Sequence, residues 1–261
     1  MCYNPHTRSR RGLKGDFVMR FLTRSELAGA AQPVLRDYRK LPEAQEHPWY
    51  VDPTLLAREV LGLTIRYRHL SEDGELLGLT SYGEMEVFLP DEREHGACVL
   101  DGKTVLIEED LLFSLCGPGR HNFTLAHECA HQILKALYPA SYCDGAAARR
   151  ALCCRQHRLC ARGSGYDWEE WQMDVLASEL LMPRDLLMKN LRLAGIPQGV
   201  TILNPVWRKS EYGCFLNVCD RMGVSKQALA YRMKLLGLLG RNQMDCPNSM
   251  IDIMMDEEET G

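Results

Sequence analysis

The sequence contains no long apolar run. No segment approaches the ~18 consecutive apolar residues of a membrane-spanning helix, and the N-terminus lacks the continuous apolar stretch of a secretory signal peptide. The sequence also has no internal repeat and no low-complexity tract, and its 46% apolar and 25% charged residues are ordinary values for a globular protein. We therefore expect a cytoplasmic protein that is neither fibrous nor disordered.

The cysteines lack the dense spacing of a small secreted scaffold. The chain has 11 of them, an odd number, spread along 261 residues, so reduced thiols are favoured over disulfides. A chain of this length can bury a sizeable core, as one large domain or as one domain with a small appendage.

The chain also lacks a strong net charge. Its formal charge of -4 means that no overall field draws the molecule to nucleic acid or to a membrane. The charges are unevenly distributed along the chain. Most charged residues among residues 1–24 are basic, whereas all charged residues among the last ten residues are acidic. We expect a disordered basic N-terminal extension over residues 1–24 and an acidic tail over residues 243–261.

Between these ends, the apolar periodicity predicts an α+β fold. Three- and four-residue steps predict a helix over residues 25–46, and a second helix follows Pro53. Short apolar or alternating runs then predict a small antiparallel sheet of three to five strands, with Asp101-Gly102 as a hairpin turn. The expected strands are 63–67, 76–80, 85–89 and 103–107.

The second half of the chain has mainly helical periodicity. One helix is expected after Gly117-Pro118-Gly119 with Asn122 as its N-cap, and others over residues 168–181 and 184–193, the first of them stopped by Pro183. We expect residues 25–200 to form the main domain and residues 201–242 to form a small helix-turn-helix-like domain.

The stretch RHNFTLAHECAHQIL, residues 120–134, contains His127, Glu128 and His131. On a helix the two histidines lie one turn apart on the same face, and Glu128 projects about 60° from His131. Two imidazoles can therefore hold one metal ion while the carboxylate reaches a water molecule on it. The plain alternative is that these are polar residues at the edge of an amphipathic helix.

A site of this kind needs a third protein ligand and an open position for water. The stretch DWEEWQMDVLASELLMP, residues 167–183, offers Glu170 as the ligand and Asp174, four residues later, as a partner for the far nitrogen of a ligand histidine. Glu169 is the weaker ligand candidate, because Met173 occupies the matching place. The alternative, a solvated acidic helix face, does not explain the histidine motif on a separate helix, so we favour the ligand interpretation.

FTLAHECAHQIL followed by EWQMDVLASELLMP resembles the ImmA/IrrE family of zinc metallopeptidases, in which F-T-L-A-H-E-x-x-H precedes E-x-x-A-N-x-F-A-x-x-L-L-M-P. The similarity covers most of residues 25–240, including the strand-rich segment from about residue 52 and the ending VSKQALAYRMKLLGLL. The sequence departs from that pattern at Met173, Asp174 and Leu176, and its insertion between the motifs is longer. Asp174 keeps a hydrogen-bond acceptor in place of the usual Asn.

The resemblance implies a zincin-like metallopeptidase domain. His127, His131 and Glu170 would be the Zn²⁺ ligands and Glu128 the catalytic base, in a zinc-dependent endopeptidase that hydrolyses a peptide bond of a protein substrate. Members of the family cleave repressor-type transcription factors of mobile elements or of a stress response, so a helix-turn-helix transcriptional repressor is the implied substrate.

Two further parts of such a site stay open at this point. An oxyanion donor is expected among four residues near the motifs, which are His121, Tyr138, Tyr142 and Tyr166. An exposed sheet edge beside the active-site helix would bind an extended substrate segment by strand addition.

The insertion between the motifs contains four cysteines and His157, which suggest a second zinc site. Their spacing is not a paired C-x-x-C arrangement, so a plain reduced loop is favoured. The four insertion cysteines are Cys143, Cys153, Cys154 and Cys160. A fifth cysteine, Cys129, lies inside the histidine motif and is expected to pack rather than to bind metal.

Residues 215–237 have helix-turn-helix spacing, with Gly223 at the turn and Ser225 as an N-cap. Their surroundings are basic, which raises DNA binding as the minor alternative, since a lone helical pair is more often used for packing or protein docking. The competing class for the whole chain is thus a non-catalytic zinc-containing regulator that binds DNA or a repressor partner. A third class is a metal-dependent hydrolase of non-peptide amides.

Overall fold

The computed structural model describes residues 21–90, 98–113, 118–142, 151–155 and 168–248. The folded part begins before the boundary expected at residue 25, because Leu22 is fully buried and Thr23 caps the first helix. Most of the expected N-terminal extension and most of the acidic tail lie outside the described residues. No helix in the described part is long and apolar enough to cross a membrane.

The fold is α+β, as predicted, and its first helices are short. Helix α1 (Arg24–Tyr38) begins at a capping box, in which Thr23 and Glu26 satisfy each other's backbone N–H groups. The helix expected over residues 25–46 is in fact divided, because the chain turns after Tyr38 and Pro42 starts α2 (Pro42–Glu46) in the position where proline favours a helix start. Two more short segments follow, α3 (Pro53–Leu55) and η1 (Leu56–Val60).

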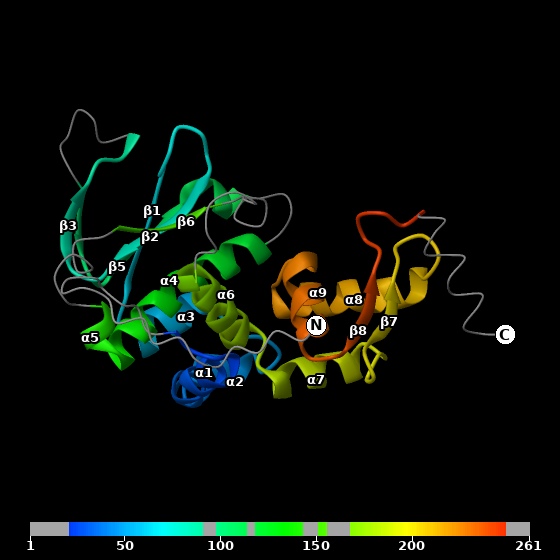
Figure 1. Cartoon of the computed structure of the whole chain (residues 1–261). Helices are drawn as coiled ribbons and strands as arrows, with labels where there is room; N and C mark the ends of the chain where they lie inside the picture. The colour runs from blue at the N-terminus through cyan, green and yellow to red at the C-terminus, as the bar shows by residue number, and fades with distance from the viewer. Residues whose placement is uncertain (1–20, 91–97, 114–117, 143–150, 156–167, 249–261) are drawn as a thin grey trace, which may run out of the picture.

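The main sheet has the strand order β1-β5-β2-β6 (Figure 1). Strand β5 pairs in parallel with β1 and antiparallel with β2, so the prediction of an antiparallel sheet is wrong for one pair of strands. Strand β5 lies between β1 and β2 although it follows both in the chain. Alternating polarity identifies a strand but not its neighbour. The strands are β1 (Thr64–Arg68), β2 (Leu76–Ser81), β5 (Thr104–Glu108) and β6 (Ala151–Arg155).

The predicted hairpin at Asp101-Gly102 is also wrong. Strand β4 (Cys98–Asp101) pairs with β3 (Glu84–Val87) in a separate two-stranded sheet, whereas β5 pairs with β1 and β2. A tight turn does occur there, with Gly102 at φ +74°, a conformation that glycine adopts without strain. The turn therefore connects two sheets, because β2 and β1 already occupy both edges of β5.

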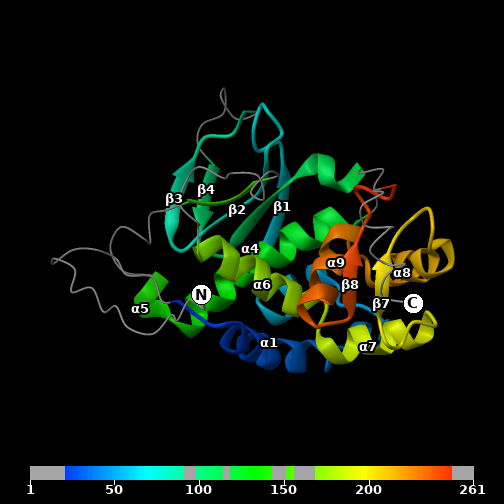
Figure 2. The same ribbon diagram turned by 45° about the vertical axis from the view of Figure 1, so that its right-hand side comes forward.

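Helix α4 (Gly119–Leu137) packs against the sheet, α6 (Trp168–Leu181) packs beside α4, and α1 packs against α6 (Figures 1 and 2). Helix α4 begins three residues before the N-cap expected at Asn122, whose side-chain amide instead donates to the carbonyl of Gly223 at 2.9 Å. The other helices of this part are η3 (Glu109–Phe113), α5 (Pro139–Tyr142) and α7 (Arg184–Leu193).

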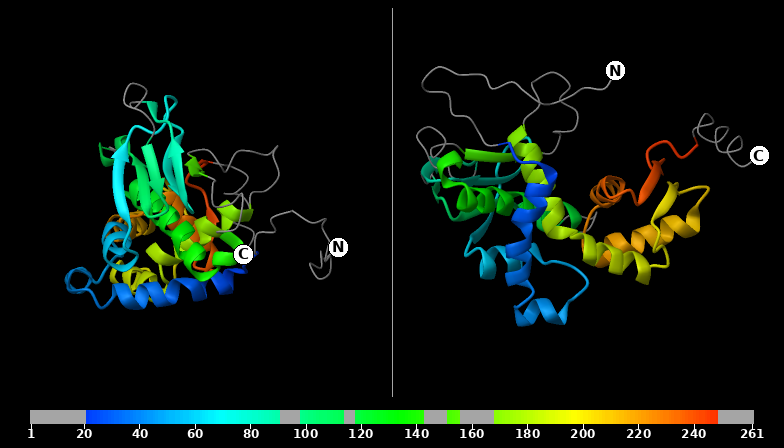
Figure 3. Two further views of the ribbon diagram at one scale, coloured as in Figure 1. Left: turned by 90° about the vertical axis from the view of Figure 1, so that its left-hand side faces the viewer. Right: turned by 60° about the horizontal axis from the view of Figure 1, so that its bottom comes forward.

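The C-terminal part contains α8 (Lys209–Met222) and α9 (Lys226–Leu235), with β7 (Val200–Leu203) parallel to β8 (Leu239–Asn242), at the end of the molecule opposite the sheet (Figure 3). The predicted turn is confirmed, because Gly223 is left-handed at φ +62° and the Ser225 hydroxyl caps α9. One hydrophobic core joins these helices to the site helices through Ala126 of α4 and Ala177 of α6.

Candidate metal centre

The two motif helices place their polar residues in a buried position where α4 crosses α6. His127 and His131 lie one turn apart on α4, and neither is exposed to solvent. Glu170 lies in the first turn of α6 and is also buried. The apolar residues on both sides of each motif anchor the two helices in the core, so these three side chains are held between them.

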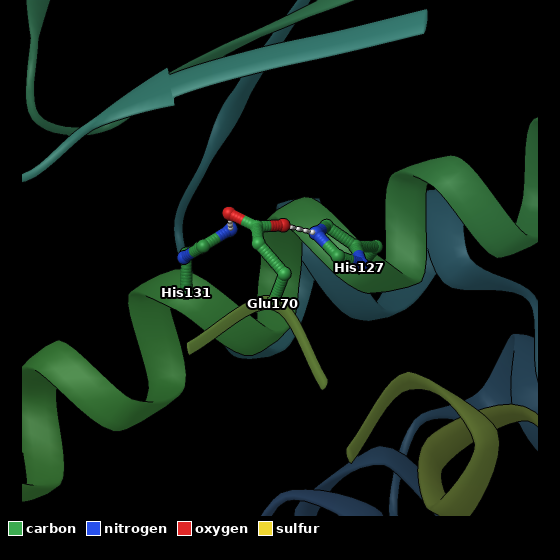
Figure 4. A group of neighbouring side chains, drawn as sticks. All are labelled: His127, His131 and Glu170. Carbon is green, nitrogen blue, oxygen red and sulfur yellow. Dashed lines mark hydrogen bonds and ion pairs between the residues drawn. The ribbon is translucent and has the colours of Figure 1, made fainter. Parts of the chain in front are cut away.

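The three side chains point toward one another, as Figure 4 shows. One oxygen of Glu170 lies 2.9 Å from Nε2 of His127, and the other lies 3.8 Å from Nε2 of His131. One potential ligand atom from each residue lies within 4.8 Å of the other two. Two imidazole nitrogens and a carboxylate oxygen in a buried cluster are a donor set that fits a metal ion.

Asp174 contacts His127 on the side away from this cluster, as the sequence predicted. Its Oδ1 lies 2.9 Å from Nδ1 of His127, and a carboxylate can only accept there, so we assign the Nδ1 position of this imidazole as protonated. Nε2 of His127 faces Glu170 at 2.9 Å, and a metal ion bound by Nε2 would take the place of that contact. This arrangement is the usual way in which a carboxylate orients a ligand histidine.

His131 has a different partner, which sequence reasoning missed. Nδ1 of His131 lies 3.1 Å from the hydroxyl of Tyr82, the residue after β2, and that hydroxyl lies 3.0 Å from a carboxylate oxygen of Glu169. Tyr82 and Glu169 are both buried. The sequence indicates Glu169 only as a weaker ligand candidate, and nothing local in it marks Tyr82, because Tyr82 is 49 residues from His131.

Glu128 is fully buried on the face of α4 that is turned toward the sheet. A Cβ atom at Gly78 of β2 would lie 2.5 Å from Oε1 of Glu128 and 2.9 Å from Thr124 Cγ2. A glycine leaves room for the carboxylate in its present position, and any larger residue at this point of the strand would require a neighbouring side chain to shift. The Glu128 side chain is thus confined between α4 and the backbone of β2, next in sequence to a ligand candidate.

Among the four oxyanion candidates, two are described in detail. His121 lies beside Tyr67, whose hydroxyl is 3.0 Å from Nε2, and its Nδ1 is 3.1 Å from Asn122 Oδ1, so its polar atoms are used elsewhere. Tyr138 packs against the main core. Tyr166 and the side chain of Tyr142 lie outside the described residues.

The cysteine predictions are tested only in part. Cys129 is buried in the main core, and this burial raises the pKa of its thiol, so it packs as a neutral group as expected. Cys143, Cys160 and His157 lie outside the described residues. The expectation of a plain loop is wrong at residues 151–155, because the backbone of Cys153 and Cys154 lies in β6, paired with β2. The second zinc site in the insertion stays the minor alternative.

A second group of donor atoms lies at the ends of β1 and β5. His69, Glu108 and Asp110 each have a donor atom within 4.8 Å of the others. The buried carboxylate of Glu108 already accepts from the backbone N–H groups of Leu70 and Asp110, at 2.8 and 3.4 Å, and lies 3.2 Å from His69 Nδ1. These contacts account for Glu108 as a residue that holds the strand ends together.

Comparison of the chain with known protein families and with curated proteins finds no match. The assignment of a function therefore depends on the chemistry of the buried His-His-Glu group, which can hold a metal ion.

Proposed function

We propose that the protein is a zinc-dependent endopeptidase. The observation that supports this most directly is the convergence of His127, His131 and Glu170 in one buried cluster, with Glu128 buried beside it on the same helix. A catalytic zinc site has three protein ligands and an open position for water, and the described residues of the cluster supply a set of three.

Each residue has a role that follows from its place. His127, His131 and Glu170 hold the ion, and Asp174 keeps His127 in the tautomer that binds it. A zinc ion held there lowers the pKa of a bound water and polarises a substrate carbonyl. Glu128 accepts the proton of the attacking water and then donates it to the leaving amine. The missing side chain at Gly78 of β2 leaves the space that the Glu128 carboxylate occupies.

The substrate class in this proposal is a protein, and specifically a helix-turn-helix transcriptional repressor. The support for it is the resemblance of the two motifs to the ImmA/IrrE family, to which we propose that the chain belongs. The cytoplasm, where such a repressor acts, is the corresponding location.

A Glu128→Gln variant tests the peptidase, because it removes the base and keeps the ligands. Purified wild type should contain about one zinc per chain, Glu128→Gln should keep it, and His131→Ala and Glu170→Ala should lose it. Zinc-loaded wild type and Glu128→Gln are then incubated with a cell lysate and new peptide N-termini are identified by mass spectrometry. N-termini produced by wild type alone support the proposal. Absence of bound metal, or identical N-termini from both proteins, contradicts it.

A DNA- or repressor-binding regulator is the second candidate, favoured by the exposed residues Lys226, Gln227 and Lys234 of α9. A helix-turn-helix protein usually places the N-terminal residues of its second helix against the bases. Here the N-cap of that helix, Ser225, packs against the backbone of α4 at Gly119, so Lys226 and Gln227 are the exposed residues of its first turn. Fluorescence anisotropy with duplex DNA separates the two candidates, since salt-sensitive binding by wild type and Glu128→Gln alike would favour the regulator.

A further inference from the structure

The two candidate metal ligands on α4 are oriented by different kinds of partner. His127 faces a carboxylate, which can only accept a hydrogen bond. His131 faces the hydroxyl of Tyr82, which can either donate or accept. Tyr82 alone therefore leaves the tautomer of His131 undetermined. If the hydroxyl donated to Nδ1, the proton of a neutral His131 would be on Nε2, where it would block metal binding.

Glu169 resolves this choice. The Tyr82 hydroxyl donates to its Oε1 at 3.0 Å. A tyrosine hydroxyl has one proton, and once this is used the oxygen can only accept from His131. The proton of His131 is then on Nδ1, and its Nε2 lone pair points to Glu170 at 3.8 Å.

We propose that Tyr82 and Glu169 are positioning residues that hold His131 in the metal-binding tautomer. The chain of contacts runs Glu169, Tyr82, His131, and each of its residues is buried. Glu169 and Glu170 are neighbours in the first turn of α6. This turn thus supplies both a metal ligand and the acceptor that orients another ligand. The inference rests on the proposed metal site but not on peptidase activity.

Tyr82 also packs against His131, with ring centroids 6.0 Å apart. Loss of the hydroxyl must therefore be separated from loss of packing, and Tyr82→Phe does this because it keeps the ring. The chain offers a matched control in Tyr67, whose hydroxyl lies 3.0 Å from Nε2 of His121, also on α4. Tyr67→Phe removes the same kind of contact from the same helix but from a histidine outside the cluster.

The first measurement is the zinc affinity of the full chain, by competition with a chromophoric chelator. Tyr82→Phe should weaken zinc binding by about 10- to 100-fold, the usual loss for a residue that orients a ligand. Tyr67→Phe should bind as wild type does. Glu169→Gln keeps an acceptor for the Tyr82 hydroxyl, so it should bind zinc nearly as tightly as the wild type. Glu169→Ala removes that acceptor, so its zinc affinity should fall as that of Tyr82→Phe does. Equal affinities for the two tyrosine variants, or for the two Glu169 variants, would overturn the proposal.

The second measurement is the tautomer itself, from ¹⁵N NMR of the histidine-labelled metal-free protein, with His131→Ala to identify the signals. Wild type should show His131 protonated at Nδ1, and Tyr82→Phe should show a mixture of tautomers. A wild-type His131 protonated at Nε2 would refute the inference. This readout needs no zinc and no cleavage, so it also distinguishes a failure of the inference from a failure of the proposed peptidase.

Discussion

The guanidinium of Arg232 in α9 donates to both carboxylate oxygens of Glu179 in α6, at 2.6 and 2.5 Å. Its Nε also donates to the backbone carbonyl of Met182 at 3.0 Å, and both side chains are largely buried. Helix α6 contains the ligand candidate Glu170 in its first turn and Glu179 in its last. The C-terminal helices are therefore tied to the helix that completes the His-His-Glu cluster.

The Arg232–Glu179 pair should contribute strongly to stability. Arg232→Met leaves the Glu179 carboxylate buried without its partner, and we expect the free energy of unfolding to fall by about 3–5 kcal/mol. Arg39 and Asp185 form a matched exposed pair at 2.7 Å, so Arg39→Met should cost under about 1 kcal/mol. Urea unfolding followed by circular dichroism checks both. Two separate unfolding transitions in the wild type would contradict the conclusion that the C-terminal helices share a hydrophobic core with the site helices.

Gly78→Ala should impair Glu128 without removing the metal. The added methyl would meet Oε1 of Glu128 at 2.5 Å, so the carboxylate or the strand must shift. We expect cleavage of a substrate found with the wild type to fall at least about tenfold, while the zinc content is kept, because a small misplacement of a catalytic group is costly.

Gly29→Ala is the control for that experiment. Gly29 lies in α1 with nothing near its Cβ position, so alanine there should leave cleavage unchanged and stabilise the protein by about 0.5–1 kcal/mol. If both glycine variants cleave as the wild type does, the strand backbone does not confine Glu128.

Asp174 should affect zinc affinity through its side-chain oxygen. Asp174→Ala removes the acceptor for Nδ1 of His127, and we expect zinc to bind about 10- to 100-fold more weakly. Asp174→Asn keeps an oxygen that can accept, so its loss should be smaller. Chelator competition measures both variants, and an alanine variant that binds as tightly as the asparagine variant would show that the contact does not orient His127.

The described cysteines should differ in reactivity. Burial raises the pKa of Cys219 to about 12 and raises that of Cys129 as well, so both thiols stay protonated at pH 8 and are shielded, whereas Cys246 is exposed. Iodoacetamide at pH 8 followed by peptide mapping should show Cys246 modified first. Cys129 and Cys219 should react only after unfolding in urea, and their early modification in the folded protein would mean that the core opens readily.

Much of the metal cluster could be predicted from the sequence because its internal spacings are local. His127 and His131 are four residues apart, as are Glu170 and Asp174. Helix formation alone places residues at this spacing on the same face. The structure brings the first three of these together and places Asp174 against His127, as predicted. The turn at Gly223 with its cap at Ser225 was predictable for the same reason.

The sequence by itself determined the helices that contain the motifs, the positions of the candidate ligands on them and the α+β class. Only the tertiary structure decided that β5 lies parallel to β1, that Gly78 makes room for Glu128, and that Tyr82 links His131 to Glu169. The physical reason is distance along the chain. Helical periodicity and capping act within a few residues, whereas strand neighbours and buried hydrogen-bond partners are chosen among residues that only folding brings into contact.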